Sequence, residues 1–169
     1  MNKLNNAPVD KNNVRLVVEH DGHTHYNISS KAKTIIGREI CFSSYGLFSV
    51  YGCGNFQSVM GFFQWLRTGR SHELCRLMWG ATSNSYLGFQ ADPLLTLNHC
   101  QSYVTEALYH RIISDENLAH AVANSSYPFA YYNISPDGTT PIPVEHAYWM
   151  CDIAEEARIR VRDWMGFNF

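Results

Sequence analysis

Three histidines, His20, His23 and His25, lie on either side of the dipeptide Asp21-Gly22 near the start of the chain. The Asp-Gly dipeptide favours a tight hairpin turn, which would place His20 opposite His23. Neighbouring imidazoles can bind one transition-metal ion, but no further ligand is evident near them in the sequence. We therefore expect an exposed hairpin with polar residues at its tip and no metal site.

A second segment that could carry chemistry runs from Phe62 to Arg67. It combines three aromatic rings and a leucine with one amide, Gln64, and one cation. This composition fits a core helix, and it also fits a helix that presents polar groups at the edge of a ligand site. An aromatic and hydroxyl-rich run, Phe42 to Ser49, precedes the segment, and Leu87-Gly88 follows it.

The charged residues near the C-terminus form a run of mixed sign. Acidic and basic side chains interleave at helical spacing at Glu155, Glu156, Arg158, Arg160, Arg162 and Asp163. Such a run is typical of a solvated helix face stabilised by pairs of opposite charge one turn apart. We do not interpret it as a surface for nucleic acid.

Apolar spacing predicts that most of the chain is helical. One helix begins at Ser58 and ends at Gly69, and a short one covers residues 70–79. Asp92-Pro93 predicts the start of a longer helix, because Asp can cap a helix and Pro suits its first turn. The apolar face of that helix comprises Leu97, Cys100, Val104, Leu108 and Ile112.

Two further helices are predicted in the C-terminal third, over residues 114–122 and 144–165. The apolar face of the last helix comprises Ala147, Met150, Cys151, Ala154, Ala157, Val161 and Trp164. Apolar residues that recur every three or four positions indicate that each helix buries one side against the rest of the domain.

Extended structure is predicted mainly near the N-terminus. Residues 14–18 and 23–28 form a hairpin, residues 34–42 a third extended run, and residues 45–54 an irregular loop. The predicted fold class is α+β, with a small N-terminal β-hairpin or sheet packed against a mainly helical body. We expect residues 1–13 to form a flexible polar arm and residues 14–169 to form a single domain.

The amino-acid composition excludes several classes of protein. The 169 residues are 46% hydrophobic and 17% charged, with a net charge of −2, which does not fit a disordered chain or a protein that coats DNA. Five widely spaced cysteines include no C-x-x-C pair, so neither a zinc site nor a disulfide framework is indicated. The sequence contains no membrane-length apolar run and no hydrophobic leader, so we expect a cytoplasmic protein.

The order of segments over residues 40–125 resembles the NADAR family, the YbiA-like N-glycosidases linked to ADP-ribose and riboflavin chemistry. The Phe42 to Ser49 run is similar to the family's F-S-N-F-like loop. The aromatic residues with Gln64 and Arg67 are similar to its Y/F-Q-x-x-K core, with Arg in place of Lys. Leu87-Gly88 matches its Leu-Gly turn, and Ala107-Leu108 lies in the helix that follows.

The resemblance implies a YbiA-like body and a ligand site. Arg38, Gln64 and Arg67 would contact phosphates or ribose, and Tyr148 and Trp149 would stack on a base. The family's catalytic Glu falls at Met60, or at Val59 if the alignment slips by one, and neither side chain can activate water.

Two later acids are the candidates to replace the missing carboxylate. Asp137 corresponds to the late Asp of the family pattern. Glu145 is followed by His146, Tyr148 and Trp149, so that an acid, an imidazole and two rings lie within five residues. Alternatively, Glu145 occupies the first turn of the last helix, where its charge suits the helix dipole.

The leading functional hypothesis from the resemblance is an N-glycosidase acting on an ADP-ribose-type or nucleotide-sugar bond. Its partner would be a small nucleotide sugar or an ADP-ribosylated nucleoside, with nucleic acid only as a modified substrate, and no cofactor is expected. The alternatives are a non-catalytic binder or inhibitor with the same fold, and a structural or assembly protein. A carboxylate in the cleft would favour the enzyme, and a cleft without one would favour the binder.

Overall fold

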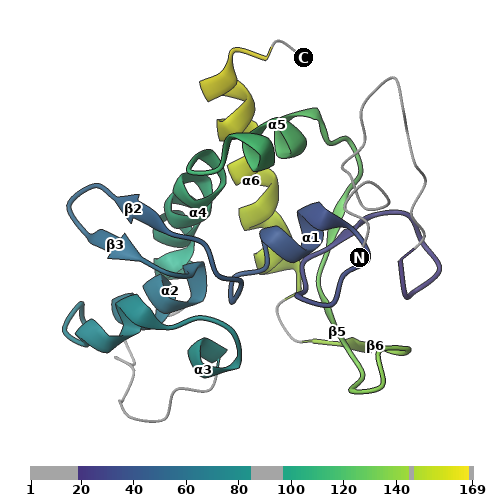
Figure 1. The fold of residues 1–169 in the computed structure, drawn as a ribbon, viewed down its shortest axis with the longest axis horizontal. Helices are drawn as coiled ribbons and strands as arrows, with labels where there is room; N and C mark the ends of the chain where they lie inside the picture. Colours follow the sequence, from purple (N-terminus) through teal and green to yellow (C-terminus); the bar gives the residue numbers. More distant parts are fainter. Residues whose placement is uncertain (1–18, 85–96, 145–146, 168–169) are drawn as a thin grey trace.

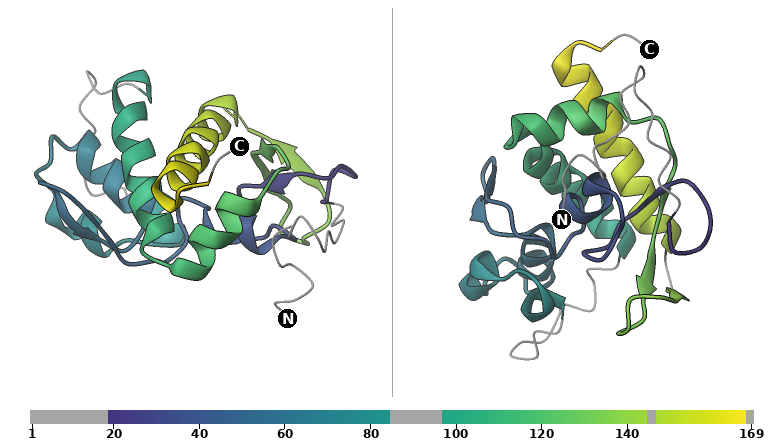
Figure 2. Two further views of the ribbon diagram at one scale, coloured as in Figure 1. Left: turned by 90° about the horizontal axis from the view of Figure 1, so that it is seen from above. Right: turned by 45° about the vertical axis from the view of Figure 1, so that its right-hand side comes forward.

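The computed structural model describes residues 19–84, 97–144 and 147–167, and the fold is mixed α+β. Two long helices, α4 (Leu97–Ile113) and α6 (Ala147–Met165), pack side by side in the middle of the molecule (Figures 1 and 2). Helix α5 (Glu116–Asn124) packs against both of them. Every other described element lies around this central group.

Shorter elements flank the central helices on both sides. Helix α2 (Val59–Arg67) packs against α4 and against the 3₁₀ helix η2 (Glu73–Leu77), and α3 (Ala81–Asn84) follows. Helix α1 (Ile35–Glu39) packs against α5 on the opposite side (Figure 1).

The strands are short and form three separate pairs. Strand β1 (Tyr26–Asn27) runs parallel to β4 (Phe129–Ala130). Strands β2 (Phe48–Val50) and β3 (Gly54–Phe56) form an antiparallel hairpin, as do β5 (Tyr132–Ile134) and β6 (Pro141–Pro143). The N-terminal part therefore contributes β1 to a pair with a strand about a hundred residues later in the chain.

The helix predictions are confirmed where a side chain caps the first turn. The Ser58 hydroxyl accepts from the Gly61 amide at 2.9 Å, and α2 begins at the next residue. The Asp115 carboxylate accepts from the Leu118 amide at 3.1 Å at the start of α5. Each bond satisfies a backbone donor that the helix itself leaves unpaired.

The long helices bury most of the faces that their spacing predicts, although Ala147 and Cys151 on α6 are only partly buried. In α4 the side chains of Cys100, Val104, Leu108 and Ile112 are buried, and in α6 those of Met150, Ala154, Ala157 and Val161. Trp164 is 55% exposed, contrary to the prediction. The predicted cap at Asp92 lies outside the described residues.

The predicted extended run over residues 34–42 is wrong, because α1 occupies its centre. The Thr34 hydroxyl caps this helix by accepting from the Gly37 amide at 3.2 Å. A Cβ at Gly37 would lie only 2.1 Å from the Asn27 carbonyl oxygen, so glycine is what allows α1 to pack onto β1. The isoleucines at positions 35 and 36 favour a strand in isolation, but the cap and this packing favour a helix.

Three smaller predictions also need correction. The irregular loop predicted over residues 45–54 contains β2 and the turn to β3. The short helix predicted over residues 70–79 is the single 3₁₀ turn η2. The tight turn at Asp21-Gly22 is present, but the chain after it pairs with β4, and residues 14–18 lie outside the described residues, as does the predicted arm 1–13.

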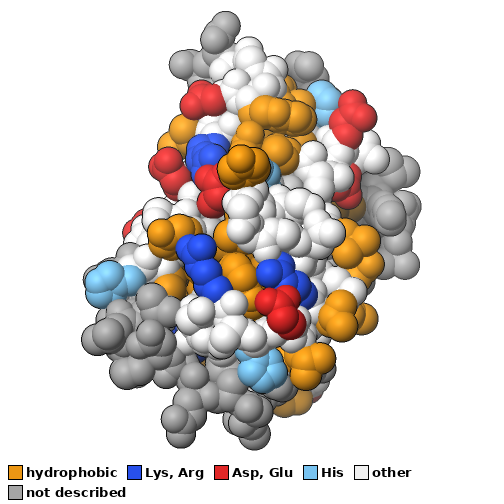
Figure 3. Space-filling view, turned by 90° about the vertical axis from the view of Figure 1, so that its left-hand side faces the viewer, with side chains coloured by type: hydrophobic (Ala, Val, Ile, Leu, Met, Phe, Trp, Pro, Cys, Tyr) orange, Lys and Arg blue, Asp and Glu red, His pale blue; other side chains and the backbone are white. Residues whose placement is uncertain are grey.

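One side of the molecule mixes cations with hydrophobic side chains. On the face that carries β2, β3 and α2, Lys or Arg side chains lie among hydrophobic ones (Figure 3). In this region the Arg76 guanidinium lies 4.6 Å from the ring centre of Phe56 and 4.7 Å from that of Trp65. It also donates to the Cys53 carbonyl at 2.5 Å, so Arg76 ties η2 to the β2–β3 hairpin.

The lengths and hydropathies of the described helices bear on membrane insertion. None of them is both long and apolar enough to cross a bilayer.

Candidate functional site

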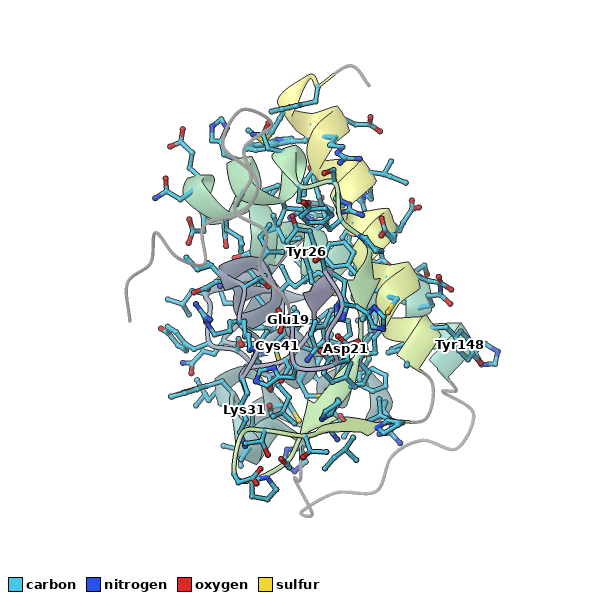
Figure 4. All side chains as sticks on the ribbon, turned by 90° about the vertical axis from the view of Figure 1, so that its right-hand side faces the viewer. Glu19, Asp21, Tyr26, Lys31, Cys41 and Tyr148 are labelled. Carbon is cyan, nitrogen blue, oxygen red and sulfur yellow. The ribbon has the colours of Figure 1, made fainter. Side chains whose placement is uncertain are left out.

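A small hollow lies where segments from five parts of the chain meet. Its volume is about 90 Å³. The segment after β1, the turn before Ser44, the first turn of α2, the chain around β5 and the first turn of α6 surround it. The described residues lining it are Ile28, Ser29, Ser30, Cys41, Phe42, Ser43, Met60, Tyr131, Asn133 and Met150. Cys41 is visible near the middle of the face in Figure 4.

Backbone hydrogen bonds hold these segments together. The Met60 amide donates to the Phe42 carbonyl at 2.7 Å, and the Ile28 amide donates to the Ala130 carbonyl at 2.8 Å. The fully buried Asn27 side chain bonds the backbone of Tyr132 through both its ends, at 3.1 and 3.3 Å. The hollow therefore has walls that are fixed by the core of the fold.

The lining of the hollow is neutral. Hydroxyl, amide and thiol groups alternate with apolar side chains, and none of the described lining residues is Asp, Glu, Lys or Arg. The Cys41 thiol and the Ser43 hydroxyl lie 3.4 Å apart. Burial raises the pKa of the Tyr131 hydroxyl, and the neighbouring Cys41 adds to this effect, so Tyr131 keeps its proton.

Two of the predicted ligand residues support the hollow from behind. The buried Gln64 amide donates to the Ser83 carbonyl at 3.2 Å and lies 4.0 Å from the Met60 sulfur. Trp149 is buried, and its ring centre lies 6.5 Å from that of Phe42. Both residues thus position lining side chains, and neither lines the hollow itself.

Neither predicted arginine lines the hollow. The Arg38 guanidinium donates to the carbonyls of Ala32 at 2.7 Å and Lys33 at 3.2 Å, which braces the turn before α1. The Arg67 guanidinium lies over the Phe63 ring at 5.3 Å from its centre, near the end of α2. The structure therefore does not bring the two cations together.

The remaining predicted residues lie elsewhere. Tyr148 projects from the first turn of α6 at the edge of the molecule and is 69% exposed (Figure 4). Asp137 is exposed in the β5–β6 turn, where hydrogen bonds from Ser135 and Thr139 lower the pKa of its carboxyl. It does not line the hollow, and Glu145 lies outside the described residues.

The histidine cluster is arranged differently from the prediction. His25 is buried, and its Nε2 contacts both carboxylate oxygens of Asp21 at 2.8 and 2.9 Å, while His23 is exposed. Burial by itself would raise the pKa of the Asp21 carboxyl, but hydrogen bonds from the His23 amide and the His25 ring outweigh it, so the pKa is lowered. Within the described ranges, no three His, Cys, Asp or Glu side chains gather in a group that could hold a metal ion.

Sequence reasoning missed several lining residues. The spacing of the cysteines bears only on disulfide and zinc sites, and Met150 is predicted only as part of an apolar helix face. Tyr131 follows β4, whose partner β1 lies about a hundred residues earlier, and Asn133 lies in the next strand, β5, so no local pattern indicates that they lie beside Cys41. Ser43 lies within the Phe42 to Ser49 run that carries the family resemblance, and this run is the signal that could have indicated it.

Two larger and more open grooves lie on the surface. One, of about 680 Å³, runs between α4 and α6 beside Asp152, Glu155 and Glu156. The other, of about 540 Å³, lies beside β2 and the end of α4. Neither groove is lined by Met60, the position at which the resemblance places the family's catalytic Glu, whereas the smaller hollow is, so the hollow is the better candidate.

Comparisons with known proteins do not decide the family. No match was found. No family model fits the chain, and neither the curated proteins nor the solved structures include a significant match. The resemblance to the NADAR family therefore stays a prediction.

Proposed function

We propose that this protein binds a nucleotide sugar or ADP-ribose-type ligand in the hollow without cleaving it. The observation that carries the proposal is the position of Met60. The family resemblance places a catalytic Glu at this residue, and Met60 lines the hollow. A thioether there preserves the shape of a pocket and removes the carboxylate that cleavage of an N-glycosidic bond requires.

Size and polarity define which part of the ligand would enter. At about 90 Å³ the hollow is much smaller than a typical ligand pocket of roughly 300–1,000 Å³. It would take one neutral ring or its edge, and the remainder of the ligand would lie on the surface outside. Hydroxyl and amide groups such as Ser43 and Asn133 would donate to and accept from the ring substituents.

A second candidate, hydrolysis, is favoured by one feature of the chain. Met150 on the first turn of α6 lines the hollow, and Glu145 immediately precedes this helix in the sequence. Glu145 would then supply the carboxylate that is missing at Met60. Binding and hydrolysis are separated by an assay, because only hydrolysis releases the base.

Binding is tested by calorimetric titration with ADP-ribose. Thermal unfolding gives a second readout, because a ligand that binds only the folded state raises Tm. Asn133→Ala removes a lining amide and should weaken binding by about 2- to 10-fold, as expected for one neutral hydrogen bond. Asn117→Ala, at an exposed position of α5, is the matched control and should bind as the wild type does. Absence of binding by the wild type to a panel of nucleotide sugars would overturn the proposal.

Turnover is tested on an ADP-ribosylated nucleoside with the wild type, Asp137→Asn and Glu145→Gln. The proposal expects binding and no base release. Base release that disappears in Glu145→Gln while binding persists would assign hydrolysis instead.

A further inference from the structure

Three sulfur-containing side chains from three different segments line the hollow, and we propose that it binds a soft monovalent metal ion, Cu(I), through Cys41, Met60 and Met150. Cys41 comes from the turn after α1, Met60 from the first turn of α2 and Met150 from the first turn of α6. This inference goes beyond the proposed function, and it does not depend on a nucleotide sugar being bound.

The type of donor selects the ion. Thiolate and thioether ligands favour Cu(I), whereas carboxylates and water favour harder cations such as Mg²⁺ and Ca²⁺. Met150 is buried and Met60 is partly buried, so their thioethers are largely removed from water. Methionine has three rotatable bonds, which allows both thioethers to adjust to an ion in a small cavity.

The charge of the site points to a monovalent ion. Binding replaces the thiol proton of Cys41 with the metal, the S–H bond breaks, and the proton leaves to solvent. A thiolate and a monovalent cation together carry no net charge, which suits a lining without charged residues among those described. A divalent ion would leave one positive charge buried and uncompensated, which is costly.

The cavity also leaves Cys41 accessible to an ion. Cys41 is a free thiol, partly buried, whose polar neighbour is the Ser43 hydroxyl at 3.4 Å. A volume of about 90 Å³ accommodates an ion together with one or two waters, each with a share of about 30 Å³. By contrast, Cys75 and Cys100 are fully buried and do not line the hollow.

The experiment is a titration of the reduced, metal-free protein with Ag(I), which shares the preference of Cu(I) for sulfur and is redox-inert. A second titration uses Cu(I) in competition with a chromophoric chelator. Met60→Leu and Met150→Leu conserve volume and keep all five thiols, so they test thioether ligation without changing adventitious thiol binding. Met78→Leu is the matched control, because Met78 is a buried methionine that does not line the hollow.

We expect one tight site per chain. Cys41→Ser should weaken it by at least about 100-fold and each hollow methionine variant by roughly 10-fold or more, since even the loss of an outer-shell partner typically costs 10- to 100-fold. Met78→Leu and Cys53→Ser should leave the tight site unchanged. Wild-type affinity in both Met60→Leu and Met150→Leu would overturn the proposal, and so would a tight site that persists in Cys41→Ser. Circular dichroism of each variant reports whether it folds, and the two leucine variants decide the matter if Cys41→Ser does not.

Discussion

The packing of α2 against η2 predicts that Gly61→Ala destabilises the protein. A Cβ at Gly61 would lie 2.5 Å from the Cys75 carbonyl oxygen, 3.0 Å from the Met78 carbonyl oxygen and 3.1 Å from the Ser58 hydroxyl. Ordinary contacts between carbon and a carbonyl oxygen are about 3.3–3.6 Å, so the backbone of η2 would have to move by several tenths of an ångström.

Three contributions decide the size of the effect. Ala is favoured over Gly inside a helix by about 1 kcal/mol. Overpacking against fixed backbone costs roughly 1–3 kcal/mol. The Ser58 hydroxyl, which accepts from the Gly61 amide at 2.9 Å, would also be displaced, and loss of such a cap costs about 1 kcal/mol. The net expectation is a loss of about 1–3 kcal/mol in the free energy of unfolding.

The measurement is urea denaturation of the wild type, Gly61→Ala and an exposed control, Ser102→Ala on α4. For a chain of this length, Tm should also fall by about 2–4 °C for each kcal/mol lost. The control should change stability by less than about 0.5 kcal/mol. If Gly61→Ala is as stable as the wild type or more so, helix propensity outweighs the contact and the described packing of α2 on η2 is incorrect.

Two further predictions concern the central helices. Leu108→Ala removes a fully buried side chain of α4 and should lower the free energy of unfolding by about 2–5 kcal/mol. Urea denaturation measures the change, and an unchanged midpoint would contradict the burial of Leu108. Hydrogen bonds from Arg160 and His110 lower the pKa of Glu106, so they stabilise the fold at neutral pH and that stabilisation is lost as pH falls below the ordinary value of 4.5. The Tm of Glu106→Gln should therefore be lower than that of the wild type at pH 7, with a gap that narrows in acid; a gap that does not change with pH would refute this.

Local signals explain why much of the helical structure is predictable from the sequence. The caps at Ser58 and Asp115 act within three residues, and the buried face of α4 repeats every three or four residues. The parallel pairing of Tyr26 with Phe129 joins residues about a hundred positions apart, and no local pattern contains that information. Residues that follow β4, Tyr131 and Asn133, line the hollow together with Cys41, so the lining of the hollow is not predictable from local patterns either.

The candidate site was predictable only in part. Gln64 and Trp149 are predicted to be ligand residues, but both pack behind the lining: the Gln64 amide donates to the Ser83 carbonyl, and the Trp149 ring packs against Phe42 and Phe63. Arg38 is predicted to be a ligand residue because of its charge, but its guanidinium donates to the carbonyls of Ala32 and Lys33. Side chains that bond their own loop cannot be distinguished from ligand contacts by residue type.

The most direct test of ligand binding in the hollow is a titration with ADP-ribose followed by NMR of ¹³C-labelled methionine methyl groups. Met60 and Met150 line the hollow, whereas Met78 is buried elsewhere in the core and serves as the internal control. We predict that the Met60 and Met150 signals shift in a saturable way while the Met78 signal does not move. Shifts confined to other methionines, or no shift at saturating ligand, would contradict the assignment of the hollow as the ligand site.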